Sequence, residues 1–368
     1  MIEKGKISSF QMAIMMYPTI LATALLLLPG ITAARAGRDM WLSPVWASLA
    51  GFLAVYLAYR LNRLYPKESI IQYSGHIVGR TLGKAIGLIY LFFYLHTTGI
   101  ILREYAEFIL SSYLFKTPII IVIGSMVIAC SLAVRGGVEV LGRIAQTFVP
   151  IYIVLLMLMM IMLLPELKTD NMLPVMGKGI VLSMLGAVTP SSWFIGEFIL
   201  MSFLLPVVTD REKGLKWGII STFAIMLTMV FTNLITLFIF GDITSTITYP
   251  VNEAARWIRL ADFFEHVESI VMVIWMAGTF VKISVYFYAL AVGTAQWLNL
   301  SDYRPVVLPL GYLVALFGIW SFSSLQEMAH FLGTTGTFYP ASVQTVVPIV
   351  LLLVSAIRKG DRQGGFKS

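Results

Sequence analysis

Two ionisable side chains stand in stretches of sequence that are otherwise apolar. Lys282 lies in the middle of TFVKISVYFY (279–288), and Glu197 lies within LGAVTPSSWFIGEFILMSF (185–203). A lysine at the centre of a bilayer costs about 2.5–3.5 kcal/mol on insertion scales, and such residues face a bundle interior or a watery cavity. Lys282 is therefore predicted to have a partner or to release its proton, because burial disfavours its charged form. Either proton-linked switching or a permanent structural pairing fits this pattern.

Glu197 allows three interpretations. Its carboxylate is suited to accept a ligand ammonium or to carry a coupling proton. A glutamate in the first turn of a half-helix is also favoured by the helix dipole, which makes a structural role equally compatible with the sequence. The third interpretation is that Glu197 and Lys282 neutralise each other.

The elements that position these two residues are long apolar helices. Hydrophobic residues make up 58% of the 368 residues, charged residues 12%, and the mean hydropathy is +0.85, which is far outside the soluble range. A barrel would show short alternating strands instead, so the fold class is an all-α polytopic membrane protein with about ten transmembrane helices. The spans are predicted near 10–35, 41–65, 84–112, 117–134, 140–164, 180–208, 215–240, 267–297, 305–322 and 338–357.

Lys and Arg gather in alternate loops, which predicts that both termini lie in the cytoplasm. The chain is interpreted as a single membrane domain (1–368), with a cytoplasmic N-terminus (1–9), a ten-helix bundle (10–357) and a cytoplasmic tail (358–368). The formal charge of +7 is mostly a topology signal, and no nucleic acid is expected as a partner beside the lipid bilayer.

The sequence gives little support for a metal site or for an enzyme. Cys130 is the only cysteine, and the four histidines fall in different segments without metal-ligand spacing. No metal, no cofactor and no catalytic residue are predicted, because paired carboxylates, a histidine cluster and a nucleophile motif are all missing from the sequence.

Two spans contain helix breakers at corresponding positions. In the first, Pro18 precedes Thr23, and in the sixth, Pro190, Ser191, Ser192 and Gly196 lie within seven residues. The first and sixth of ten spans correspond if the chain consists of two inverted five-helix halves, a pattern of transporters that bind substrate at the breaks. Freed amides there would hold an anionic group. The alternative is that these prolines only kink two packed helices.

The opening of the chain resembles a known family. GKISSFQMAIMMYPTILATALLLLPGITAARAGRDMWLSPV (5–45), with Gln11, the Leu28–Pro29 pair and AGRDMW, resembles the B subunit of spore germination receptors. The resemblance continues in YP (65–66) followed by QYSGHIVGRTLGK, and in NEAARWIRLADFFE (252–265). The family is similar to amino acid, polyamine and organocation transporters with the LeuT-type fold, which implies a 5+5 inverted repeat with broken helices 1 and 6.

The resemblance also implies a location and partners. Its members sit in the inner membrane of bacterial spores, form a receptor with an A subunit and a lipoprotein C subunit, and sense a small germinant such as an amino acid. We therefore expect a germinant receptor subunit, with a proton-coupled amino acid permease as the alternative. A membrane enzyme is the third and weakest class.

In LeuT-type folds the eighth helix passes beside the break in the first, where sodium-dependent members hold a cation. The Lys282 ammonium is predicted to take that place by bonding carbonyls around Ile20 to Thr23. Tyr105 is expected to close over the ligand, as third-helix aromatic residues do in similar folds. The predicted ligand-binding residues are Ile20, Leu21, Ala22, Thr23, Ala24, Tyr105, Ser191, Ser192, Trp193 and Gly196, with Lys282 and Glu197 as the cation mimic or coupling pair. The first break lacks glycine, which predicts a small site.

Three further segments carry charges. Arg103, Glu104 and Glu107 are placed at the outer end of the third span, where snorkelling is easy, and Arg103 and Glu107 are expected to form an i,i+4 ion pair. Residues 66–82 are predicted to form an amphipathic cytoplasmic helix. Residues 249–266 are too polar to span and are interpreted as a lid, a docking surface or an interfacial helix.

Overall fold

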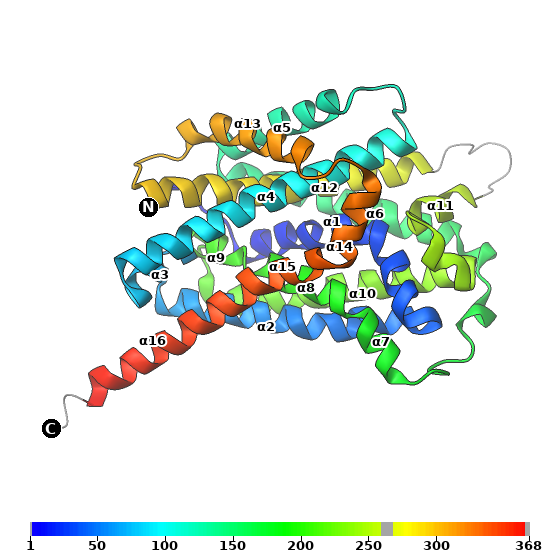
Figure 1. The fold of residues 1–368 in the computed structure, drawn as a ribbon, viewed down its shortest axis with the longest axis horizontal. Coiled ribbons are helices and arrows are strands. Elements are labelled where there is room, and N and C mark those ends of the chain that lie inside the picture. Colours follow the sequence, from blue (N-terminus) through cyan, green and yellow to red (C-terminus); the bar gives the residue numbers. More distant parts are fainter. Residues whose placement is uncertain (1, 259–267, 365–368) are drawn as a thin grey trace.

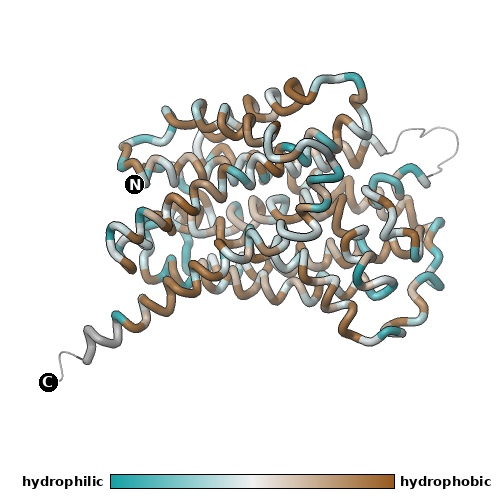
Figure 2. The backbone as a smooth tube through the Cα atoms, viewed as in Figure 1, coloured by the Kyte–Doolittle hydropathy of each residue, from teal (hydrophilic) through white to brown (hydrophobic). Residues whose placement is uncertain are grey.

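The computed structural model describes residues 2–258 and 268–364 and is helical almost throughout (Figure 1). Hydrophobic residues follow the long helices, and hydrophilic residues gather at their ends and in the connections (Figure 2). The helices are α1 Ser9–Ala36, α2 Ser43–Leu64, α3 Ile70–Val78, α4 Arg80–Ser112, α5 Ile119–Gly136, α6 Val138–Met162, α7 Ile180–Gly186, α8 Val188–Phe198, α9 Met201–Leu204, α10 Gly214–Phe240, α11 Pro250–Arg256, α12 Glu268–Leu298, α13 Arg304–Trp320, α14 Leu325–Gly333, α15 Thr335–Ala341 and α16 Val347–Gly364.

Each predicted span has a counterpart among these helices. Within the described residues, eight helical runs are long and apolar enough to cross a membrane. The first of them, Ser9–Leu64, contains both α1 and α2, and the shorter apolar helix α13 accounts for the ninth predicted span. The prediction of an all-α membrane protein is confirmed.

The two predicted breaks have different outcomes. The sixth span is interrupted, as three helices α7, α8 and α9, but its gaps fall at 187 and at 199–200 instead of at the serines before Gly196. The first span is not broken, because α1 runs continuously through Pro18 and Pro29. A proline removes only one amide donor, and leucine and alanine, which follow Pro18, are strong helix formers. The prediction of a break near Thr23 was wrong.

Helix α1 occupies the centre of the bundle. It contacts α6, α8, α10 and α12, and most of its side chains are buried. Its start is defined by a capping box, in which the Ser8 side chain accepts from the Gln11 amide and the Gln11 side chain accepts from the Ser8 amide. Helix α12 is likewise buried from Val281 to Val292. The two helices therefore bring Thr23 and Lys282 into the interior.

The residues before α1 form a short segment that docks on the bundle through the buried residues Glu3 and Ile7. Ile7 forms a parallel bridge with Val208, just after the sixth span. The buried carboxylate of Glu3 accepts from the Val138 amide at 3.2 Å and from the Tyr303 hydroxyl at 3.1 Å. The segment thus connects the starts of the fifth and ninth spans with the end of the sixth.

The predicted amphipathic segment contains helix α3, which folds back against α4. Its apolar face, made of Ile70, Ile71, Tyr73 and Ile77, is buried. Of the segment 249–266, which was interpreted as a lid, a docking surface or an interfacial helix, α11 accounts for residues 250–256, and residues 259–266 lie outside the described residues.

The α3–α4 contact depends on a glycine. A Cβ added at Gly83 would lie 2.3 Å from the Cα of Gly75, whereas a Cβ at Gly75 would meet nothing within 4 Å. We expect Gly83→Ala to separate the helices and to lower the free energy of unfolding by about 1–3 kcal/mol, measured by thermal unfolding in detergent. Gly75→Ala is the matched control and should leave stability nearly unchanged. If Gly83→Ala and Gly75→Ala had the same free energy of unfolding, the close contact of α3 and α4 at Gly83 would be contradicted.

Candidate functional site

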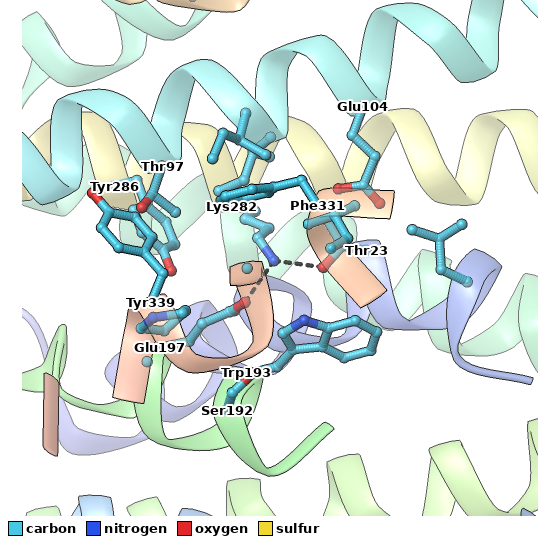
Figure 3. Close-up of a pocket in the computed structure, with 17 residues that line it drawn as sticks. Thr23, Thr97, Glu104, Ser192, Trp193, Glu197, Lys282, Tyr286, Phe331 and Tyr339 are labelled. Atoms are coloured by element: carbon cyan, nitrogen blue, oxygen red, sulfur yellow. Dashed lines mark hydrogen bonds and ion pairs between the residues drawn. The ribbon is translucent and has the colours of Figure 1, made fainter. Parts of the chain in front are cut away.

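A small cavity lies at the centre of the bundle, between α1, α4, α8, α12 and the α14–α15 pair (Figure 3). Its volume, about 60 Å³, leaves room for a few water molecules or a small group. Its wall consists of Thr23, Leu27, Thr97, Ile100, Ile101, Glu104, Ser192, Trp193, Gly196, Glu197, Lys282, Tyr286, Phe331, Leu332, Gly336, Tyr339 and Pro340.

Lys282 forms the electrostatic centre of this wall. Its side chain is 1% exposed, and its Nζ donates to Thr23 Oγ1 at 2.7 Å and to Glu197 Oε1 at 2.8 Å (Figure 3). The predicted bonds to carbonyls of the first span are replaced by these two, because the carbonyls of an unbroken helix are used within it. The interpretation that Lys282 and Glu197 neutralise each other is confirmed as a buried ion pair.

Glu197 was predicted at the N-terminal end of a half-helix, but it lies at the C-terminal end of its helix. It occupies the last turn of α8, not the first turn of a half-helix. The C-terminal end of a helix carries partial negative charge, so the dipole disfavours a carboxylate there. The ammonium of Lys282 compensates this arrangement, and the Oε2 atom of Glu197 has no hydrogen-bond partner within the described residues.

The cavity brings together half of the predicted site residues. Thr23, Ser192, Trp193, Gly196, Glu197 and Lys282 line it. Ile20, Leu21, Ala22 and Ala24 are fully buried inside α1 but are not part of its described wall, and Ser191 is not part of it either.

Tyr105 is also buried, but it turns away from the cavity. Its ring stacks on Trp275 with a centroid distance of 5.6 Å, and it is not among the described residues that form the wall. The prediction that it closes over a ligand is not met in this conformation, because the face of α4 toward the cavity presents other residues.

That face of α4 was missed by the sequence interpretation. Thr97, Ile100, Ile101 and Glu104 line the cavity at i, i+3, i+4 and i+7, the spacing of a single helical face. Glu104, predicted to reach water, is only 4% exposed, and Figure 3 shows it extending from α4 at the cavity. The predicted ion pair between Arg103 and Glu107 is confirmed at 2.7 Å.

The α14–α15 pair forms the remaining wall, which the sequence interpretation also missed. Tyr339 contacts His96 at 3.3 Å, and the hydroxyls of Thr189 and Thr337 lie 3.2 Å apart. A Cβ added at Gly196 would lie 2.6 Å from the Cβ of Pro340, so glycine permits α15 to reach α8. The short helix α15 therefore packs directly against α8 at Gly196.

Three buried polar atoms of the wall lack a hydrogen-bond partner in the described part of the chain. They are Thr97 Oγ1, Glu104 Oε1 and Glu197 Oε2. Unsatisfied polar atoms are uncommon in protein interiors, and several around one cavity are typical of a site that awaits a polar occupant.

The sequence is similar to proteins of spore germination. A family model described as spore germination protein matches residues 6–327. Spore germination protein KB of Bacillus subtilis (strain 168) is 26% identical over 98% of this chain and 97% of its own length. Spore germination protein A2 of the same organism is 23% identical over 96% of each chain.

The solved structures with a similar fold include transporters. Mhp1, a nucleobase-cation-symport-1 family transporter, superimposes with a TM-score of 0.68 at 13% identity, covering 95% of this chain and 78% of its own. MhsT, solved in complex with L-phenylalanine, gives a TM-score of 0.61 at 12% identity and 96% and 99% coverage. The predicted LeuT-type fold is confirmed by these neighbours.

Proposed function

Since the chain belongs to the spore germination protein family, we propose that it is the membrane subunit of a nutrient germinant receptor. In this proposal a small germinant, an amino acid, occupies the central cavity and initiates germination. The subunit acts with A and C subunits in the inner membrane of the spore, with both termini in the cytoplasm.

The observation that carries this proposal is the cavity beside the Lys282–Glu197 ion pair. It lies between α1, α4, α8 and α12, in a fold whose solved neighbours include a transporter in complex with L-phenylalanine and a substrate-bound sialic acid symporter. A cavity of about 60 Å³ with polar atoms in a mostly apolar wall suits a small polar ligand. Ligand binding would shift the equilibrium between conformations of the helix bundle, and the A and C subunits would respond to that shift.

A second candidate function is a proton-coupled amino acid permease. The buried ion pair favours it, because two titratable groups on different helices can link protonation to movement. This function predicts that a pH gradient drives labelled amino acid into vesicles and that Lys282→Ala abolishes accumulation. Binding without any accumulation across a broad panel of amino acids would exclude it.

The receptor proposal is tested in spores. We expect deletion of the gene to abolish the loss of refractility in response to particular nutrients. The wild-type gene should restore the response, whereas Lys282→Ala should not, because Glu197 loses its buried partner. Lys116→Ala is the matched control, since Lys116 is exposed.

A normal nutrient response of the deletion strain, with other receptor genes also removed, would contradict the proposal. If Lys282→Ala restored the response as well as the wild-type gene does, the ion pair at the cavity would not be needed for germination. Deleting the gene for the A or C subunit should abolish the same responses.

A further inference from the structure

The cavity wall carries more negative than positive charge. Among the described residues its charged side chains are Glu104, Glu197 and Lys282, so one positive and two negative charges give a formal sum of −1 when all are ionised. Lys282 already binds Thr23 and Glu197. A buried carboxylate without a compensating donor is unfavourable. The wall therefore favours an occupant that carries positive charge.

Glu104 is the second carboxylate of the wall, and one of its oxygen atoms is unpartnered in the described part of the chain. Its Oε1 atom is buried and has no hydrogen-bond partner in the described residues. The neighbouring cation is already engaged, because Arg103 donates to Glu107 at 2.8 Å and to the carbonyl of Ile319 at 3.1 Å. Among the described residues, the open space in front of Glu104 Oε1 is the cavity that it lines, from which a ligand donor can approach it.

We propose that Glu104 accepts the ammonium group of the bound ligand. The inference rests on the proposed function, because it takes the cavity as the germinant site, and it narrows the ligand to compact molecules that carry a primary ammonium group. An ammonium offers three N–H donors. Glu104 Oε1 and Glu197 Oε2 are two unfilled acceptors of the same wall.

The rest of the wall limits the size of the ligand and supplies its other contacts. Ile100 and Ile101 present apolar side chains beside Glu104, and Trp193 and Tyr286 add aromatic surface, which is favourable near a cation. The Thr97 hydroxyl, which has no hydrogen-bond partner among the residues that the structure describes, is available to a ligand carboxylate. These features select amino acids with small apolar side chains over long cations.

The test uses the purified full-length chain in lipid nanodiscs. Binding of labelled glycine, L-alanine, L-valine and L-leucine is measured, together with displacement by the carboxylate that lacks the amino group, such as propionate for L-alanine. The wild type is expected to prefer the amino acid over its deaminated analogue at least tenfold. Glu104→Gln is expected to weaken amino acid binding at least tenfold and to abolish this preference.

Glu212→Gln is the control, because it makes the same change at an exposed glutamate outside the cavity wall. It should bind as the wild type does. Wild-type displacement by propionate as strong as by L-alanine would overturn the role of Glu104, as would Glu104→Gln with intact affinity and preference, or an equal loss in Glu212→Gln.

The competition between L-alanine and propionate for the wild-type protein tests the role of Glu104 even if a variant misfolds. In each of those outcomes the wild type still binds an amino acid, so the proposed function stands while the role of Glu104 fails. A folded wild-type protein that binds none of the amino acids contradicts the amino acid germinant, and with it this inference.

Discussion

Lys282→Met is expected to lower the free energy of unfolding by about 3–5 kcal/mol, because it leaves Glu197 buried without its partner. Methionine is unbranched and only one heavy atom shorter than lysine, so the loss reflects charge and hydrogen bonding more than packing. The Thr23 hydroxyl also loses its contact with the ammonium. The difference in the free energy of unfolding is measured by denaturant titration in mixed micelles.

The double variant Lys282→Met/Glu197→Leu separates stability from function. Replacing both members of a buried ion pair by apolar residues is often neutral, so we expect it to recover most of the lost stability. It should not recover the germination response. Lys213→Met is the control, because the Lys213 side chain is 63% exposed and lies 3.8 Å from Asp210, where a pair contributes less than about 1 kcal/mol. A Lys282→Met variant as stable as this control would contradict the contribution of the buried pair.

Gly196→Ala is expected to reduce ligand affinity at least tenfold without unfolding the bundle. The new Cβ would lie 2.6 Å from the Cβ of Pro340, so α15 must move away from α8 and open the wall of the cavity. Such overpacking also lowers the free energy of unfolding by about 1–3 kcal/mol. Labelled amino acid binding and the nutrient concentration that gives half-maximal germination report the change.

Gly124→Ala provides the comparison for this variant. Gly124 also lies in a long helix, α5, and a Cβ there would meet nothing within 4 Å. It should bind ligand and unfold as the wild type does. Unchanged affinity in Gly196→Ala would mean that the contact between α15 and α8 is not needed to form the site.

The helices could be predicted from the sequence because each membrane-spanning run must be long and apolar. The positions of the interruptions could not, since they depend on tertiary contacts. The cluster of Pro190, Ser191 and Ser192 indicated the sixth span correctly, yet the interruptions lie on either side of it, at 187 and at 199–200. In the first span, Pro18 predicted a break that the helix-forming residues after it prevent.

Only part of the site could be predicted from the sequence, because the rest of it also depends on tertiary contacts. Lys282 and Glu197 are conspicuous because a charge in an apolar run requires a partner. Glu104 was not, because Arg103 and Glu107 beside it resemble the charged end of a helix. Helices α14 and α15 have a mixed composition that does not indicate burial, and only their packing against α8 places Tyr339 and Pro340 at the cavity.

The burial of Glu3 has a consequence for the order in which the molecule is assembled. Its contact with Tyr303 joins residues 300 positions apart in the sequence. During synthesis this contact must wait until the chain beyond α12 has been made, and contacts of such long range form slowly. The segment before α1 is therefore among the last parts to dock, and its docking reports that the fifth, sixth and ninth spans have already assembled.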